Sequence, residues 1–144
     1  MTEVFPYSNI IAGLFILIVG FVFHWLGQFT SIINWEFATG KGLQEIGLPR
    51  EYKVYEHGIA VADSLIGWIY GFAAIGLFLK TSWGFKLALM AGAILVYHSF
   101  SYWFWTKNRR KEGHNLVSNK LRKGWFLANF ITGILAILVG WNAG

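Results

Sequence analysis

The chain has 144 residues, of which 56% are hydrophobic, 19% aromatic and 13% charged. About 25% of the residues of a soluble domain are charged, so this composition disfavours a soluble globular protein. The sequence contains no cysteine, which excludes disulfides, iron–sulfur clusters, covalently attached haem and cysteine nucleophiles, and leaves histidine, carboxylate, hydroxyl and amide chemistry.

Four apolar runs along the chain are long enough to cross a membrane, which takes about 17–25 residues of helix. The predicted spans are residues 9–29, 59–79, 83–105 and 125–141. The first and last contain no charged residue, the second contains only Asp63 and the third only Lys86. The first run has no basic segment before it and no cleavage site, so it is not a signal peptide. The sequence therefore predicts an all-α fold, an antiparallel four-helix bundle forming a single integral membrane domain over residues 1–144.

Between the first two spans, residues 30–58 mix aromatic and aliphatic side chains with four glutamates. This composition is typical of a segment at the level of the lipid headgroups, and it predicts a short interfacial helix followed by a turn at residues 47–49. Two interpretations remain open for this segment. It either packs over the end of the bundle or forms a lid over a site.

Lysine and arginine are distributed unevenly between the two sides of the predicted bundle. Ten of the twelve lie in or beside the interfacial loop 30–58 and the basic loop 106–124, whereas only Lys80 and Lys86 lie on the side of the termini. Basic loops stay in the cytoplasm, so we expect both termini on the extracytoplasmic side of a plasma (inner) membrane. Contact with anionic lipid explains the basic loop, and no nucleic-acid partner is needed.

Small residues recur on one face of each predicted helix, and they predict close helix–helix packing. Polar residues share these faces. His24, Asp63, His98 and Asn129 all lie about 7–11 Å below the cytoplasmic interface, counted at about 1.5 Å per residue. The sequence therefore predicts that they converge on one buried layer, and the polar residues expected nearest to it are Gln28, Ser64, Ser101 and Tyr102.

Asp63 is the residue that argues most strongly for a function in this layer. A buried ionised carboxylate is costly unless it is paired or protonated. The sequence offers no lysine or arginine at this depth, so the partner of Asp63 should be a histidine, a bound cation or its own proton. Asp63, His24 and His98 are accordingly the catalytic candidates.

The layer admits one structural and three functional interpretations. Interhelical hydrogen bonds alone could fix helix register. His24 and His98 could ligate a b-type haem in a pocket completed by Gln28, Asn129 and Tyr102. His24, Asp63 and His98 could instead hold a transition metal, or act as acid–base groups on a lipid or quinone. Proton-coupled transport is the third functional interpretation. Because no predicted span carries the paired Gly/Pro interruptions of transporter helices, a transporter would need several copies of the chain.

Of these, the chain best fits an accessory or cofactor-holding subunit of a larger membrane complex. Its size and its small extramembrane portion favour partners in the membrane, namely lipid, other membrane subunits or further copies of the chain. The alternatives are a free-standing membrane enzyme that acts on a lipid or quinone through His24, Asp63 and His98, and an oligomeric proton-coupled transporter.

The natural absence of cysteine makes the orientation directly testable. We expect a membrane-impermeant thiol reagent applied from outside to label Thr2→Cys and Ala143→Cys, but to label Ser118→Cys only after permeabilisation. The reverse pattern would contradict the orientation and move the polar layer to the outer leaflet.

Overall fold

The computed structural model describes residues 4–114 and 118–142, and within them every regular element is helical. Four helices are long and apolar enough to cross a membrane, at Ser8–Ile33, Arg50–Phe78, Ser82–Lys111 and Asn119–Asn142. The prediction of an all-helical chain with four membrane-length helices is therefore confirmed. Each helix extends beyond the apolar run from which it was predicted, because hydropathy marks the part suited to lipid and not the ends of the helix.

The first long helix changes geometry along its length. It begins as α1 (Ser8–Phe15), widens into a π-helical segment, η1 (Ile16–Trp25), and returns to α-helix as α2 (Leu26–Ile33). A π-helical turn pairs residues five apart instead of four, and such turns are frequent at functional sites. The segment carries His24.

After α2, the predicted interfacial segment contains the expected short helix, α3 (Trp35–Gly40). The Asn34 side chain caps it by accepting a 2.9 Å hydrogen bond from the Phe37 backbone N–H. The chain then bends around Gly47, which has a φ of +72° that favours glycine.

The second long helix begins at Arg50, within the predicted loop 30–58, directly after Pro49. It is divided into α4 (Arg50–Ile66) and α5 (Trp68–Phe78) by Gly67. We had expected an uninterrupted span, and the break is a correction. The neighbouring Trp25 explains why the residue at the break is glycine, because a Cβ at Gly67 would collide with the Trp25 indole and lie 2.8 Å from the Asp63 carbonyl oxygen.

The two remaining helices are α6 (Ser82–Lys111) and α7 (Asn119–Asn142). They include much of the predicted basic loop 106–124, which is therefore shorter than expected. Aromatic rings hold two of its cations. The Arg109 guanidinium lies 3.2 Å from the centre of the Tyr52 ring, and that of Arg122 lies 3.9 Å from the centre of the Trp103 ring.

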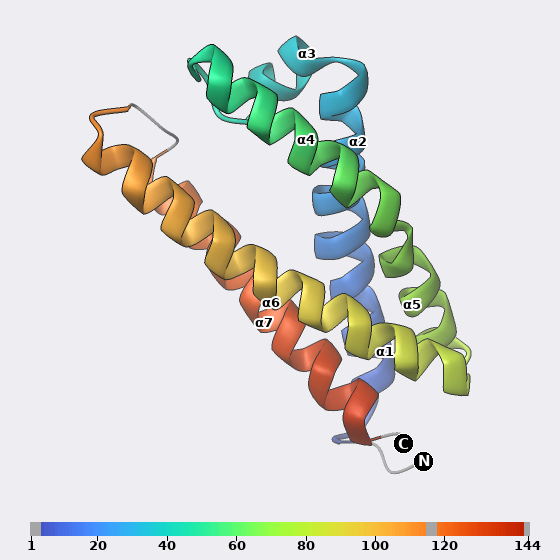
Figure 1. The fold of residues 1–144 in the computed structure, drawn as a ribbon. Helices are drawn as coiled ribbons and strands as arrows, with labels where there is room; N and C mark the ends of the chain where they lie inside the picture. The colour runs from blue at the N-terminus through green and yellow to red at the C-terminus, as the bar shows by residue number, and fades with distance from the viewer. Residues whose placement is uncertain (1–3, 115–117, 143–144) are drawn as a thin grey trace.

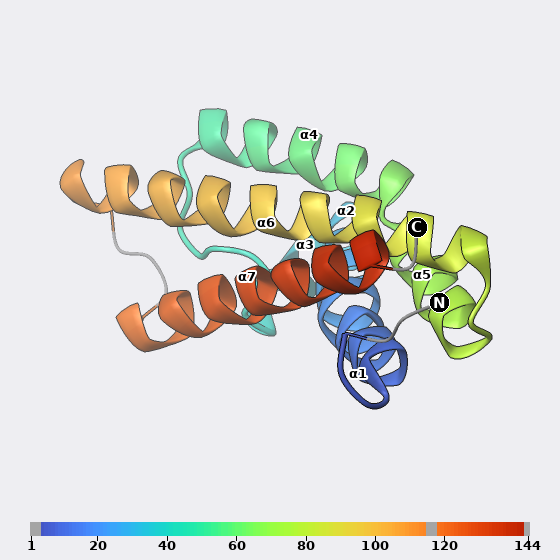
Figure 2. The same ribbon diagram turned by 90° about the horizontal axis from the view of Figure 1, so that it is seen from below.

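In space, α6 and α7 lie side by side along their length (Figures 1 and 2). The turn between α5 and α6 lies at the same end of the bundle as the start of α1 and the end of α7 (Figure 1). Towards the opposite end, α4 and α2 diverge from the α6–α7 pair (Figure 1). The molecule is thus tightly packed at one end and divided into two arms at the other.

Glycine contacts hold the packed end and the α6–α7 pair together. A Cβ at Gly84 would collide with the backbone of Gly76, and one at Gly92 would lie 2.6 Å from the Gly133 carbonyl oxygen. Close approach of this kind supplies the van der Waals contact on which helix association in lipid depends. It also explains why the small residues share one face.

Gly92→Ala tests this packing against a matched control in the adjoining helix. The added methyl group has no space, so we expect a loss of about 1–3 kcal/mol of stability. At Gly124 a Cβ would meet no atom within 4 Å, and Gly124→Ala should be neutral or stabilising by up to about 1 kcal/mol through helix propensity. Reversible unfolding in mixed micelles would measure both. Equal losses in the two variants would contradict the close packing.

Candidate functional site

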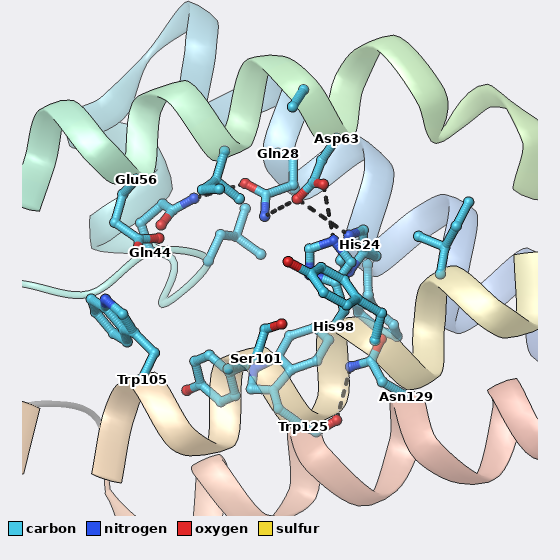
Figure 3. Close-up of a pocket in the computed structure, with 18 of the residues that line it drawn as sticks. His24, Gln28, Gln44, Glu56, Asp63, His98, Ser101, Trp105, Trp125 and Asn129 are labelled. Atoms are coloured by element: carbon cyan, nitrogen blue, oxygen red, sulfur yellow. Dashed lines mark hydrogen bonds and ion pairs between the residues drawn. The ribbon is translucent and has the colours of Figure 1, made fainter. Parts of the chain in front are cut away.

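Three helices bring His24, Asp63 and His98 together inside the bundle (Figure 3), with one potential ligand atom from each residue within 4.8 Å of the others. His98 Nε2 lies 2.9 Å from Asp63 Oδ1, and His24 Nε2 lies 3.6 Å from Asp63 Oδ2. The two imidazole rings have centroids 4.2 Å apart. The predicted convergence of these three residues is therefore confirmed.

Trp25 fixes the helix that carries His24 against the helix that carries Asp63. Its indole lies over Gly67, where any side chain would collide with it. The indole nitrogen donates a 2.9 Å hydrogen bond to the backbone oxygen of Ser64, the residue after Asp63. The helix break and the tryptophan thus position the carboxylate and the first imidazole together.

Two glutamines continue the site beyond the carboxylate. Gln28 Nε2 donates to Asp63 Oδ2 at 3.2 Å, and Gln44 Nε2 donates to Gln28 Oε1 at 2.9 Å. The position of Gln28 near Asp63 was predicted from its place one turn after His24. Gln44 was missed, because it lies in an irregular segment where no periodicity indicates the direction of a side chain.

Asn129 and Tyr102 line the same pocket as the three clustered residues, but neither hydrogen-bonds to them. Asn129 Nδ2 donates to the Trp125 backbone oxygen at 2.8 Å, whereas its buried Oδ1 has no hydrogen-bond partner among the described residues. The Tyr102 hydroxyl donates to Glu45 Oε1 at 3.3 Å. Both therefore belong to the wall of the site and not to its centre.

The hydrogen bonding of the central cluster is incomplete. Asp63 is buried and accepts from His98 and Gln28. His24 Nε2 is also buried, yet it has no hydrogen-bond partner among the described residues. Buried polar atoms are nearly always paired, so this nitrogen marks the place where a proton or a ligand would complete the site.

A pocket of about 660 Å³ extends from the cluster into the space between the two arms. Its walls come from η1, α2, α4, α6, α7 and the segment before α4. Besides the residues already named, they include Ser101, Glu56, Trp105 and Trp125 (Figure 3). The sequence analysis did not assign the two tryptophans or Glu56 to the site, and Glu56 lay in a segment predicted as loop.

The arrangement does not fit the haem interpretation. Two axial imidazoles face each other across an iron atom, with metal–nitrogen bonds of about 2 Å on each side and the macrocycle between the rings. The His24 and His98 rings are in contact, at 4.2 Å between centroids, and both direct Nε2 towards Asp63. No macrocycle can pass between them.

A single metal ion fits better. Ligand atoms at about 2.0–2.2 Å from a metal lie about 3.0 Å apart in octahedral geometry and about 3.4 Å apart in tetrahedral geometry. Each imidazole nitrogen lies near this range from one carboxylate oxygen, His98 Nε2 at 2.9 Å from Asp63 Oδ1 and His24 Nε2 at 3.6 Å from Asp63 Oδ2. The three side chains could hold a metal, or exchange a proton between imidazole and carboxylate.

Comparison of the chain with protein-family models, with curated proteins and with solved structures found no match. The geometry and the chemistry of the site itself therefore indicate what the protein does.

Trp25→Phe tests how the site is positioned. The ring remains but the bond to Ser64 is lost, so we expect a loss of about 0.5–1.5 kcal/mol of stability. Trp141 is 75% exposed, and Trp141→Phe should leave stability unchanged. Unfolding in mixed micelles, followed by circular dichroism, compares the two. A Trp25→Phe protein as stable as the parent would contradict the positioning role of the indole.

Proposed function

We propose that this protein is an integral membrane protein that holds a transition-metal ion through His24, Asp63 and His98. The observation that carries the proposal is the meeting of three potential ligand atoms, from three separate helices, within 4.8 Å of one another. Two imidazoles and a carboxylate are a ligand set suited to zinc and to non-haem iron.

The incomplete bonding of His24 favours a bound ion over a purely structural network, because its Nε2 contacts Asp63 at 3.6 Å and makes no hydrogen bond to a described residue. A network that only fixes helix register gains most when every buried member is satisfied. Here the carboxylate has two donors, while His24 Nε2 lies 3.6 Å away without a hydrogen-bond partner among the described residues. A metal bound between these atoms would satisfy the nitrogen without a large movement of any helix.

Charge balance supports the same conclusion. Glu45, Glu56 and Asp63 line the pocket, and none of the described lining residues is lysine or arginine. A divalent ion would bring positive charge to a wall whose described residues include carboxylates and neither lysine nor arginine. Gln28 and Gln44 would then orient the Asp63 carboxylate from the second coordination shell.

For the biological role, we propose a cofactor-holding or accessory subunit of a larger membrane complex. The described chain consists almost entirely of four long helices and short connections, which suits such a subunit with other membrane subunits or further copies as partners. We place its termini outside an inner membrane, in an antiparallel bundle whose basic, two-armed end is cytoplasmic.

A second candidate is a free-standing enzyme that acts on a lipid-soluble substrate. The observation in its favour is that the metal-binding cluster lies in the pocket wall, beside aromatic and aliphatic side chains such as Phe23 and Ile94. A metal held by three protein ligands keeps open positions for substrate or water. The reaction itself would then occur at the ion.

Metal binding is tested by titrating chelator-treated protein with Co²⁺ and by measuring bound zinc and iron in the purified protein. We expect one ion per chain and the visible spectrum of an imidazole-ligated Co²⁺ centre. His24→Ala, His98→Ala and Asp63→Asn should abolish stoichiometric binding. Gln28→Ala should weaken it about 10–100-fold, as loss of a second-shell partner does.

The chain supplies its own controls for this experiment. His57 is exposed and neither His57 nor His114 lines the pocket, so His57→Ala and His114→Ala should bind Co²⁺ like the parent. Circular dichroism would verify that each variant remains helical. Failure of the parent protein to bind any of the ions, or equal binding by the Asp63→Asn variant, would refute the metal site.

A further inference from the structure

The pocket differs in charge from the molecular surface around it. Lysine and arginine are abundant at the two-armed end, but the two most buried arginines, Arg109 and Arg122, do not line the pocket. Arg109 lies over the Tyr52 ring and bonds to Glu112 at 2.7 Å, and Arg122 lies over the Trp103 ring. The described wall of the pocket itself carries only acidic charge.

The side-chain amides in the pocket wall are committed to hydrogen bonds within the protein. The three side-chain amides that line it, those of Gln28, Gln44 and Asn129, all donate to protein acceptors. Acceptors remain available. Asn129 is only 6% exposed and its Oδ1 has no hydrogen-bond partner among the described residues, and the Glu56 carboxylate lines the pocket. A ligand that donates hydrogen bonds can therefore find acceptors in this wall.

Aromatic rings complete the environment. Five tyrosine and tryptophan side chains line the pocket, at Tyr55, Tyr97, Tyr102, Trp105 and Trp125. Cations are attracted to the faces of such rings, most strongly where water is excluded. Carboxylates together with aromatic faces favour an ammonium group over a neutral or an anionic head.

The pocket also continues onto the apolar surface of the bundle. Phe23, Ile66 and Tyr97 line it, yet they are 49%, 42% and 69% exposed, and they lie on spans suited to lipid. An alkyl chain could therefore extend from the pocket into the bilayer while the head remains inside. Figure 3 shows Glu56 and Trp105 at one end of the pocket and the histidine–aspartate cluster at the other.

We propose that this pocket binds an amphipathic amine, a molecule with a protonated ammonium head and a long alkyl chain. The head lies between Glu56, Glu45 and the aromatic rings, and the chain leaves between α4 and α6. This inference concerns the acidic end of the pocket and does not depend on whether a metal occupies the other end.

The test compares three ligands of equal chain length: dodecylamine, dodecanol and dodecanoic acid. Each is titrated into the full-length protein in phosphatidylcholine nanodiscs, and affinity is taken from the shift in thermal unfolding, corrected for partitioning with empty nanodiscs. We expect the amine to bind at least about ten-fold more tightly than the other two, because a charge-assisted hydrogen bond is about twice as strong as a neutral one.

Variants assign the preference to the pocket. Glu56→Gln should reduce amine affinity about ten-fold and leave dodecanol unchanged. Glu51→Gln is the matched control, because Glu51 lies on the same helix, is exposed and does not line the pocket. Equal affinities for amine and alcohol, tighter binding of the acid, or an equal effect of the two variants would overturn the proposal. Chelator-treated parent protein should retain the preference, so failure of the metal site would not be mistaken for failure of this inference.

Discussion

The structure depends on the carboxylate of Asp63, which is buried inside a bundle of apolar helices. An ionised aspartate in such surroundings is costly unless other groups compensate it. Asp63 meets this requirement with His98 from α6 and with Gln28 from α2, while His24 lies just beyond hydrogen-bond distance. Because these groups come from three of the four long helices, solvating the carboxylate also fixes the relative placement of the helices. The same hydrogen bonds therefore both compensate the buried charge of Asp63 and hold the helices in place.

Close packing at glycine residues allows the helices to bring these polar groups together. Tyr70 lies against Gly20, and Trp25 lies against Gly67, where a larger residue would collide in both cases. Each glycine is one helical turn away from a residue of the site, Gly20 before His24 and Gly67 after Asp63. The small residues thus bring backbones together and leave space for large aromatic side chains, which direct the polar groups inward. Leucine at either glycine would fill the space that the site requires.

The sequence alone was sufficient to predict four membrane-length helices and the meeting of His24, Asp63 and His98, because both follow from hydropathy and from helical periodicity. It did not reveal where α4 begins, since charged turns outside the apolar run carry no hydropathy signal. The interruption at Gly67 and the contribution of Gln44 depend on tertiary contacts, with Trp25 and with Gln28 respectively. No local pattern records such contacts. The inward-facing sides of the helices were predicted correctly for His24, Asp63 and His98, because there the packing follows the helical periodicity of the sequence.

The pocket has two ends that differ in their hydrogen-bonding groups. At the cluster end, His24 Nε2 makes no hydrogen bond to a described residue and lies beside a carboxylate, which suits an ion of high charge density. At the acidic end, acceptors and aromatic rings surround a volume that opens towards lipid-facing residues, which suits a larger and softer cation. Exposed basic residues at this end, such as Lys107 and Lys111, lie outside the pocket and in the proposed orientation would attract anionic headgroups. Lipid contact at the basic surface and ligand binding in the acidic pocket would then depend on different residues of the same small bundle.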